Sequence, residues 1–182
     1  MPERNDRGLE IADAVLRLVA RDGIEAVSMR KVATESDHSL GAVQRTYGDK
    51  DSLLRAALVR SIEHADLRIQ RRLAEIGDDA GIAGFLRAAA REVLPLEAEA
   101  LAAERVWLAF FAHAAVTPGF GRPVAERYAQ SRAAIAAILG DDAAAAAFVG
   151  LVDGLAAQLL AGVIDEPAAL AAVEAFVGRF TR

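Results

Sequence analysis

Two neighbouring polar residues, Gln44 and Arg45, carry side chains that can read base edges in DNA. Glutamine can form two hydrogen bonds with adenine, and arginine can form two with guanine. Such contacts need a short helix that presents both side chains on one face. Gly41, which lies one turn before Arg45, would let the backbone of that helix approach a ligand closely. The alternative is a solvated helix face with no partner.

The residues around this pair predict two short helices joined by a turn. Ser28 can cap a helix that ends near Glu35, and Ser39 can cap a second helix that ends near Thr46. Asp37 lies in the turn between them and can adopt the left-handed conformation that this turn needs. A longer helix from about Gly8 to Asp22 precedes the pair. The pattern is that of a helix–turn–helix, whose second helix enters a major groove.

The spacing on the second helix decides which side chains face outwards. At 100° per residue, Val43 and Tyr47 share the inner face, whereas Ala42, Gln44 and Arg45 point away from it. Ser28, Ser39 and Lys50 stand at helix N-termini, where backbone N–H groups attract phosphate. The predicted DNA-binding residues are Ser28, Arg30, Ser39, Leu40, Gly41, Ala42, Gln44, Arg45, Thr46 and Lys50.

Charge limits how this contact can work. The 182 residues carry a net charge of −5, which excludes binding of nucleic acid by bulk positive charge. Residues 28–50 hold four basic and three acidic side chains, so the local excess is one positive charge. We therefore expect modest non-specific affinity, and specific binding that uses two copies of the domain on a two-fold DNA site.

Apolar residues at helical spacing continue along the rest of the chain, and strand patterns are nearly absent. We predict an all-α protein of nine helices in two domains. Residues 1–48 form the helix–turn–helix domain, residues 49–77 a connecting helix, and residues 78–182 a C-terminal domain for ligand binding and dimerisation. The later helices are expected at about 80–93, 95–115, 118–139, 142–162 and 167–181, with Thr117 capping the third of these and Pro118 at its first position.

Residues 28–54 resemble the N-terminal DNA-binding segment of the tetracycline-repressor (TetR) family of bacterial transcription regulators. The residues that match the family pattern, in order and spacing, are Ser28, Val32, Ala33, Ser39, Gly41, Val43, Tyr47, Lys50, Leu53 and Leu54. Two positions depart from it. The turn Ser36–His38 replaces a sequence of small residues, and Gln44 replaces a tyrosine that meets a phosphate, so Gln44 is open to either phosphate or base.

The resemblance implies a repressor that binds operator DNA as a homodimer and senses a small apolar or amphipathic effector. The absence of cysteine fits a reducing compartment, and we expect the protein to work in the cytoplasm. The alternative is a helical interaction or scaffold protein without sequence-specific DNA binding. No nucleophile with an orienting base, paired-carboxylate site or phosphate loop is evident, so an enzyme is not expected. We expect no cofactor. The chain has no cysteine, and its three histidines lack metal-ligand spacing, so no metal site is expected either.

Aromatic and polar residues of the C-terminal half offer a candidate effector site, although such a cluster can also be simple core. The resemblance favours a cavity. The candidate residues are Phe85, Trp107, Phe110, Phe111, His113, Tyr128, Asp153 and Gln158.

The apolar stretch 143–164 is long enough to cross a membrane, but it is mostly alanine and lacks a basic flank. We expect it to be covered by its own domain or by a second subunit. Gly150 and Gly154, one turn apart, would let another helix approach closely, either within one subunit or across a dimer. The resemblance implies a four-helix dimer interface. Its predicted residues are Phe148, Gly150, Leu151, Gly154, Leu155, Leu170, Val173, Phe176 and Val177.

Overall fold

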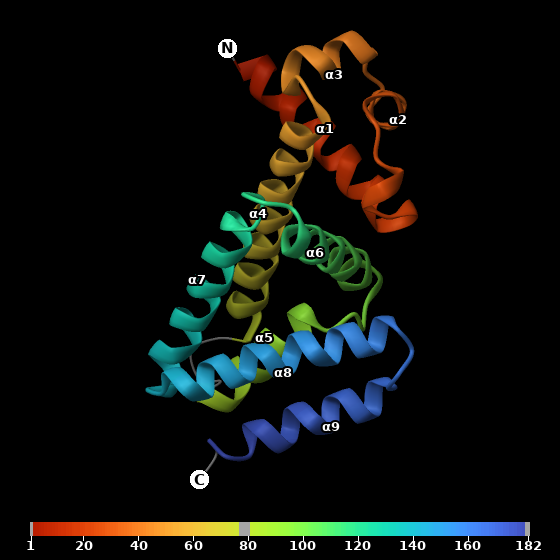
Figure 1. Ribbon diagram of the computed structural model, residues 1–182. Coiled ribbons are helices and arrows are strands. Elements are labelled where there is room, and N and C mark those ends of the chain that lie inside the picture. Colours follow the sequence, from red (N-terminus) through yellow and green to blue (C-terminus); the bar gives the residue numbers. More distant parts are fainter. Residues whose placement is uncertain (1, 77–80, 181–182) are drawn as a thin grey trace. The chain divides into compact units, whose positions relative to one another are not determined.

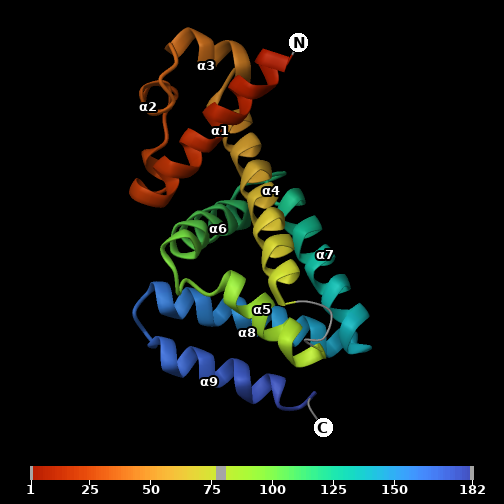
Figure 2. The ribbon, with the colours of Figure 1, turned by 180° about the vertical axis from the view of Figure 1, so that it is seen from behind.

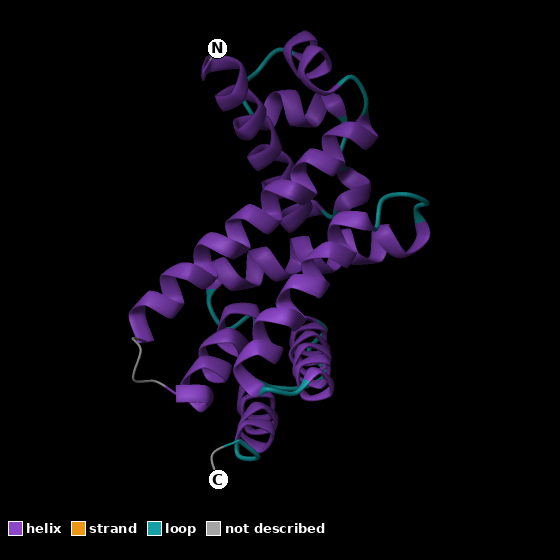
Figure 3. Ribbon diagram, turned by 90° about the vertical axis from the view of Figure 1, so that its left-hand side faces the viewer, coloured by secondary structure: helices purple, strands orange, loops and turns teal. Residues whose placement is uncertain are grey.

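The computed structural model describes residues 2–76 and 81–180, and every regular element in these ranges is helical (Figure 3). The predicted all-α class is confirmed. The elements are α1 (Pro2–Asp22), the 3-10 turn η1 (Ile24–Ala26), α2 (Met29–Glu35), α3 (Leu40–Tyr47), α4 (Lys50–Ile76), α5 (Gly81–Val93), α6 (Ala98–Val116), α7 (Arg122–Leu139), α8 (Asp142–Leu160) and α9 (Glu166–Val177).

The chain divides into two compact units, and α4 and α6 each contribute to both. Unit 1 contains residues 1–64 and 105–123, and unit 2 contains residues 65–104 and 124–182. The predicted boundary at residues 77–78 lies outside the described residues. The structure thus assigns the second half of α6 to the unit that also holds α1–α3.

Unit 1 is built on an apolar stripe of α1 that matches the predicted helical spacing. Ile11, Val15, Leu18 and Val19 are all buried. Helices α2 and α3 lie beside α1, as Figures 1 and 2 show from opposite sides, with α1 packed on α2 and α2 on α3. Helix α1 begins at Pro2 rather than near Gly8, so it is longer than predicted.

The turn between α2 and α3 contains the left-handed residue that the sequence analysis assigned to it. Asp37 has φ 56°, and it is the one described residue other than glycine with a positive φ. The His38 N–H donates to the Ala33 carbonyl (3.0 Å) and the Asp37 N–H to the Thr34 carbonyl (3.4 Å). These two bonds form a Schellman motif, which ends α2 sharply and sets the direction of α3.

Unit 2 has its core where α5, α8 and α9 meet. Phe148 of α8 packs against Phe176 of α9 with ring centroids 5.3 Å apart, and Leu86 and Leu94 complete the cluster. Helices α8 and α9 lie side by side in both views (Figures 1 and 2). Asp141 and Asp165 cap these two helices through backbone N–H groups at 2.9–3.0 Å.

The predicted start of α7 is wrong. Thr117 and Pro118 lie in a turn, and α7 begins at Arg122 with Pro123 as its second residue. Gly119 takes φ 74°, which breaks the helical path, and Phe120 is then fully buried. Burial of the Phe120 ring stabilises the observed turn at residues 117–120, so no helix starts at Pro118.

Helix α8 is long and apolar enough to cross a membrane, by length and composition alone. Its buried side chains, including Phe148 and Val152, pack within unit 2 against α5 and α9. That packing matches the expectation of a helix that its own domain covers, and it leaves the small residues on the opposite side of α8 exposed.

Candidate functional site

Helix α3 is held at both ends by hydrogen bonds that the sequence makes available. The Ser39 hydroxyl accepts the Ala42 N–H (3.1 Å), and the Tyr47 hydroxyl donates to the Gly8 carbonyl of α1 (2.6 Å). Val43, between these two ends, is fully buried. The helix is therefore fixed to α1 along its inner face, as its pattern predicts.

The outward face of α3 presents Gln44 and Arg45, and both are exposed. The expectation that Ala42 points outwards is wrong, since only 9% of its surface is accessible. Helix α2 packs against α3 and widens the inner face beyond Val43 and Tyr47. Leu40 and Gly41 are half-buried, and the Thr46 hydroxyl donates to the Ala42 carbonyl within the helix (2.9 Å).

The cations of this face have no acidic partner among the residues that the structure describes. Within the described residues, Arg30, Arg45 and Lys50 form no ion pair, and all three are exposed. Arg55 and Arg60, by contrast, bind carboxylates of α1 and α4 at 2.8 Å. A guanidinium left unpaired at the surface keeps all its donors available for a base or a phosphate.

Two of the acidic groups that the sequence count set against this face have hydrogen-bond partners in the structure. Glu35 accepts Arg17 Nε at 3.0 Å and Arg21 Nη1 at 3.2 Å, and these bonds lower the pKa of its carboxyl group. Asp49 caps α4 by accepting the Ser52 N–H (2.8 Å), which lowers the pKa of Asp49. Both carboxylates stay ionised, but Arg17 and Arg21, which lie outside residues 28–50, offset the charge of Glu35.

Ser28 and Ser39 keep the ability to contact phosphate after capping their helices. The Ser28 hydroxyl accepts the Lys31 N–H (3.3 Å), as the Ser39 hydroxyl does for Ala42. Each accepting hydroxyl still has its own proton to donate, and both serines are exposed. Backbone N–H groups at a helix start add to the attraction for an anion.

Gly41 gives a first test of the role of this face. An added Cβ would lie 3.2 Å from Arg45 Nη1, the exposed end of a flexible side chain that can move. We expect Gly41→Ala to raise the free energy of unfolding by up to ~1 kcal/mol, because alanine favours a helix interior. The same variant should bind DNA more weakly, because the added methyl group keeps the α3 backbone away from the major groove. Chemical denaturation and fluorescence anisotropy with labelled DNA measure the two effects.

Gly8→Ala is a comparison for the stability effect alone, because Gly8 accepts the Tyr47 hydrogen bond that holds α3 to α1. The added Cβ would lie 3.3 Å from the Tyr47 hydroxyl, which its hydrogen bond to Gly8 holds in place. No stability gain is expected there. Unchanged DNA affinity of Gly41→Ala would show that α3 does not approach DNA at this point.

The predicted effector residues fall into two separate groups. In unit 1, Phe110 is fully buried and stacks on Phe120 (6.2 Å), while His113 meets the same ring edge-on (4.7 Å). Arg55 lies over that ring (4.9 Å) and donates to the Gly119 carbonyl (2.7 Å). These contacts make Phe110 and His113 part of the unit 1 core, around a phenylalanine that the sequence analysis did not single out.

In unit 2, Tyr128 of α7 and Asp153 of α8 come together, and Glu104 of α6 joins them. Burial raises the pKa of Asp153, although the hydrogen bond from the Tyr128 hydroxyl opposes the shift. Glu104 is only 7% exposed, and its pKa is raised to about 8 by burial and by the charge of Asp153. Groups whose pKa is strongly shifted are typical of binding sites.

Glu104 was missed because a single glutamate on an apolar helix has no motif. The sequence offers one signal for Glu104. It lies on an apolar helix between Ala100 and Phe110, and both of these residues are buried in the structure. The remaining candidates are less enclosed: Phe85 and Trp107 are half-buried, Phe111 is 44% exposed, and the exposed Gln158 donates to the Gly154 carbonyl (3.0 Å).

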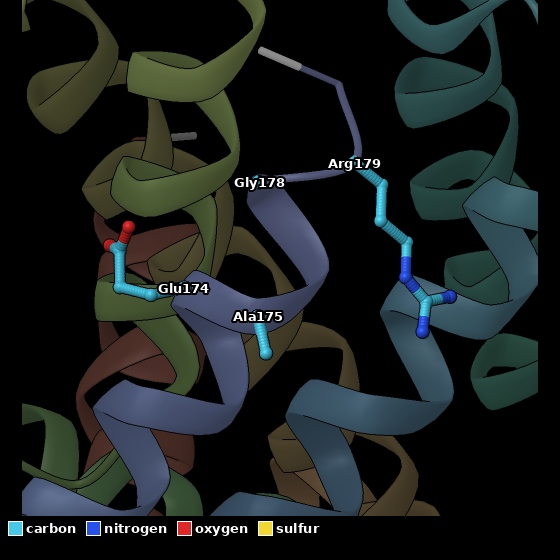
Figure 4. Close-up of a pocket in the computed structure, with 4 residues that line it drawn as sticks. All are labelled: Glu174, Ala175, Gly178 and Arg179. Atoms are coloured by element: carbon cyan, nitrogen blue, oxygen red, sulfur yellow. The ribbon is translucent and has the colours of Figure 1, made fainter. Parts of the chain in front are cut away.

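A surface hollow of about 500 Å³ lies at the C-terminal end of α9 (Figure 4). Its lining residues are Glu174, Ala175, Gly178 and Arg179. Glu174 accepts a hydrogen bond from Arg87 of α5 at 2.7 Å. In Figure 4 the side chain of Arg179 points away from Glu174. None of the predicted effector residues lines this hollow.

The predicted dimerisation residues divide by burial. Phe148, Leu155, Val173, Phe176 and Val177 are core residues of unit 2, because α5 covers them. Gly150 is exposed, and Leu151, Gly154 and Leu170 are half-buried. The surface that stays open on α8 and α9 therefore includes this second group and the small residues beside it.

Among residues 2–76 and 81–180, no three histidine, aspartate or glutamate side chains lie close enough together to hold a metal ion.

Residues 84–182, which are more than half of the chain, match the family of C-terminal domains of BetI-type transcriptional repressors. The chain belongs to the TetR family of transcriptional regulators. This confirms the resemblance seen in residues 28–54. The nicotine-responsive repressor HdnoR from Paenarthrobacter nicotinovorans is 42% identical over 64 residues, which are 31% of this chain and 33% of that protein. The chain thus aligns with about a third of the length of this relative, which is a transcriptional repressor.

Solved structures support the TetR-family architecture over more than nine-tenths of the chain. A transcriptional regulator from Rhodococcus sp. RHA1 superposes with a TM-score of 0.83 at 25% identity and covers 94% of both chains. The multidrug-binding protein EbrR, solved with ethidium, superposes with a TM-score of 0.73 at 29% identity and covers 93% of this chain and 98% of its own. The two-domain helical fold predicted from the sequence is confirmed.

Proposed function

We propose that this TetR-family protein is a transcriptional repressor that binds operator DNA as a homodimer in the cytoplasm and leaves the DNA when a small molecule binds. The observation that carries the DNA contact is the exposed pair Gln44 and Arg45, without acidic partners, on a helix fixed from behind. The residues in this role are those predicted above, with Ala42 contributing little.

The test is a mobility shift of the purified protein on the DNA upstream of its own gene, repeated across salt concentrations. We expect a sequence-specific complex whose affinity falls as salt rises, because phosphate contacts release counterions. Equal binding to this DNA and to a scrambled duplex would contradict the proposal. It would favour the alternative of a helical interaction protein.

Dimerisation is proposed through the exposed small residues of α8. A Cβ added at Gly150 or Gly154 meets no atom within 4 Å, so neither glycine serves packing inside the described part of the chain. The residues Ala143, Ala146 and Ala147 extend the same exposed, apolar surface. Small residues that stay open in one subunit suit the close approach of a second helix.

Gly150→Leu is expected to weaken the dimer and leave the subunit folded, because the larger side chain blocks the approach of the second helix. The protein concentration is set at least tenfold above the dissociation constant of the wild-type dimer. At this concentration, analytical ultracentrifugation should show a dimeric wild type and a dissociated variant, and the circular dichroism of the helices should be the same for both. Ala129→Leu on α7, also exposed, is the control. A fully dimeric Gly150→Leu variant would place the interface elsewhere.

The effector is proposed to act through α4, a helix of 27 residues that begins three residues after α3 ends. The same helix carries Asp66 and Arg68, which bind Arg127 of α7 and Glu92 of α5. An effector that prefers one arrangement of these helices would shift the population of DNA-competent dimers. A coupling free energy of ~1–3 kcal/mol corresponds to about 5- to 150-fold release. That EbrR was solved with ethidium supports a small-molecule effector.

A further inference from the structure

The chain carries side-chain amines at two positions only. Of its 21 lysine and arginine residues, Lys31 and Lys50 are the lysines. An amine that has lost its proton is a nucleophile, whereas a guanidinium stays protonated and does not react with acyl donors. Acylation of side-chain nitrogen is therefore limited to these two residues, and both are exposed on unit 1.

Lys50 is the first residue of α4, and its ammonium group has no carboxylate partner among the described residues. The acidic residues on either side of it are bound elsewhere. Asp49 accepts the Ser52 N–H at 2.8 Å, and Asp51 accepts Arg55 Nε at 2.8 Å. The Lys50 ammonium is thus available for a phosphate, next to the backbone N–H groups that begin α4.

Lys31 lies in different surroundings, which makes it the reference for Lys50. It is the third residue of α2 and is not among the predicted DNA-binding residues. The pKa of the Asp22 carboxyl group, at the end of α1, is lowered by the hydrogen bond from Arg21 and also by the charge of Lys31. Lys31 therefore lies near the C-terminal end of α1.

The two lysines lie toward opposite ends of α1. Lys50 follows Tyr47 by three residues, and the Tyr47 hydroxyl donates to the Gly8 carbonyl. Gly8 and Asp22 are 14 positions apart, which is about 21 Å along an α-helix. A modification at Lys50 therefore acts beside the end of α3, whereas one at Lys31 acts at a distance from it.

We propose that Lys50 is a modification site, at which acylation by an acyl thioester releases the protein from DNA. The ammonium group first gives one proton to water. The neutral amine then attacks the thioester carbonyl carbon, so that an amide C–N bond forms and the C–S bond breaks. The second amine proton goes to the departing thiolate, which leaves as a thiol. The inference rests on the proposed function, because it adds a covalent input to the same DNA contact.

The amide product is uncharged, and this loss is large for the surface concerned. Residues 28–50 hold four basic and three acidic side chains, so acylation of Lys50 removes their whole positive excess. Each phosphate contact contributes a slope of about −0.9 to the dependence of log affinity on log salt, and a dimer would lose two contacts. We expect affinity for any duplex to fall roughly tenfold or more, with a shallower salt dependence.

The test uses the full chain as wild type, Lys31→Arg and Lys50→Arg, since each variant keeps a single side-chain amine. The proteins are incubated with acetyl-coenzyme A at mildly alkaline pH, and mass spectrometry locates the acetyl groups. Anisotropy with the DNA upstream of the protein's own gene is measured before and after treatment. Each protein is compared with itself, so a changed starting affinity does not affect the result.

Wild type and Lys31→Arg should lose affinity by roughly tenfold or more on acetylation, and Lys50→Arg should keep its own affinity. An equal loss in treated Lys50→Arg overturns the inference, because the loss then comes from Lys31 or the α-amino group. Wild type that keeps its affinity with Lys50 fully acetylated overturns it too, and this result needs no substitution. Acetylation of Lys31 with none at Lys50 also overturns it.

Protection by DNA gives a second readout, which a mere loss of stability in the acetylated protein would not produce. DNA added before acetyl-coenzyme A should prevent the acetylation of Lys50 and leave that of Lys31 unchanged. Equal acetylation of Lys50 with and without DNA overturns the inference.

The proposed function and this inference fail in different ways. Untreated wild type that binds operator and scrambled DNA alike contradicts the repressor, while loss of that binding on acetylation of Lys50 still supports the modification site. Specific DNA binding by wild type acetylated at Lys50 contradicts the inference and leaves the repressor standing.

Discussion

Replacing Arg45 by alanine should strongly reduce sequence preference in DNA binding while the protein remains a folded dimer. Arg45 is exposed and unpaired, and Val43 and Tyr47 hold the helix without its help. A bidentate arginine–guanine contact is worth about 1–3 kcal/mol, and a dimer makes two of them. The affinity ratio between operator and scrambled DNA should therefore fall by roughly 30-fold or more. Anisotropy titrations on both duplexes, at one salt concentration, give this ratio.

Two further alanine variants make the result specific. Lys50→Ala, at the first position of α4, should weaken binding to both duplexes alike and reduce the salt dependence, because a phosphate contact carries no sequence information. Arg132→Ala, an exposed arginine on α7, should change neither quantity. Arg45→Ala with an unchanged operator preference would mean that α3 does not read bases.

The local rules of helix formation predicted most of the fold, because their signals lie close together in the sequence. Caps at Ser28 and Ser39 and the left-handed Asp37 depend on neighbouring backbone groups, and the structure has each of them. The start of α7 could not be predicted from such local signals. It depends on the burial of Phe120 against Phe110, a contact between residues that a local pattern does not connect.

The candidate sites show the same division. The exposure of Gln44 and Arg45 follows from the spacing on one short helix, whereas the burial of Ala42 follows from α2, which lies against it. Glu104 meets Asp153 only because α6 and α8 fold into one unit, although 49 positions separate them in the sequence. Spacing along a single helix can therefore predict which side chains that helix exposes, but not the cluster of Glu104, Tyr128 and Asp153, to which three helices contribute.

The stability of the protein without ligand should fall as the pH rises from about 5 to about 8. The pKa of Glu104 is raised from an ordinary 4.5 to about 8 in the folded chain, chiefly by burial. Between these values the folded chain holds a proton that the unfolded chain has released, so raising the pH favours unfolding. The raised pKa of Asp153 acts in the same direction. The contribution of Glu104 should be on the order of a few kcal/mol across this window.

Glu104→Gln isolates that contribution, because glutamine resembles the protonated glutamate and does not titrate. Denaturant unfolding at a fixed protein concentration should give a shallower pH profile for this variant, with greater stability than the wild type above pH ~8. Glu99→Gln should keep the slope of the wild type, since its carboxylate is exposed. Parallel profiles for Glu104→Gln and the wild type would contradict the buried proton.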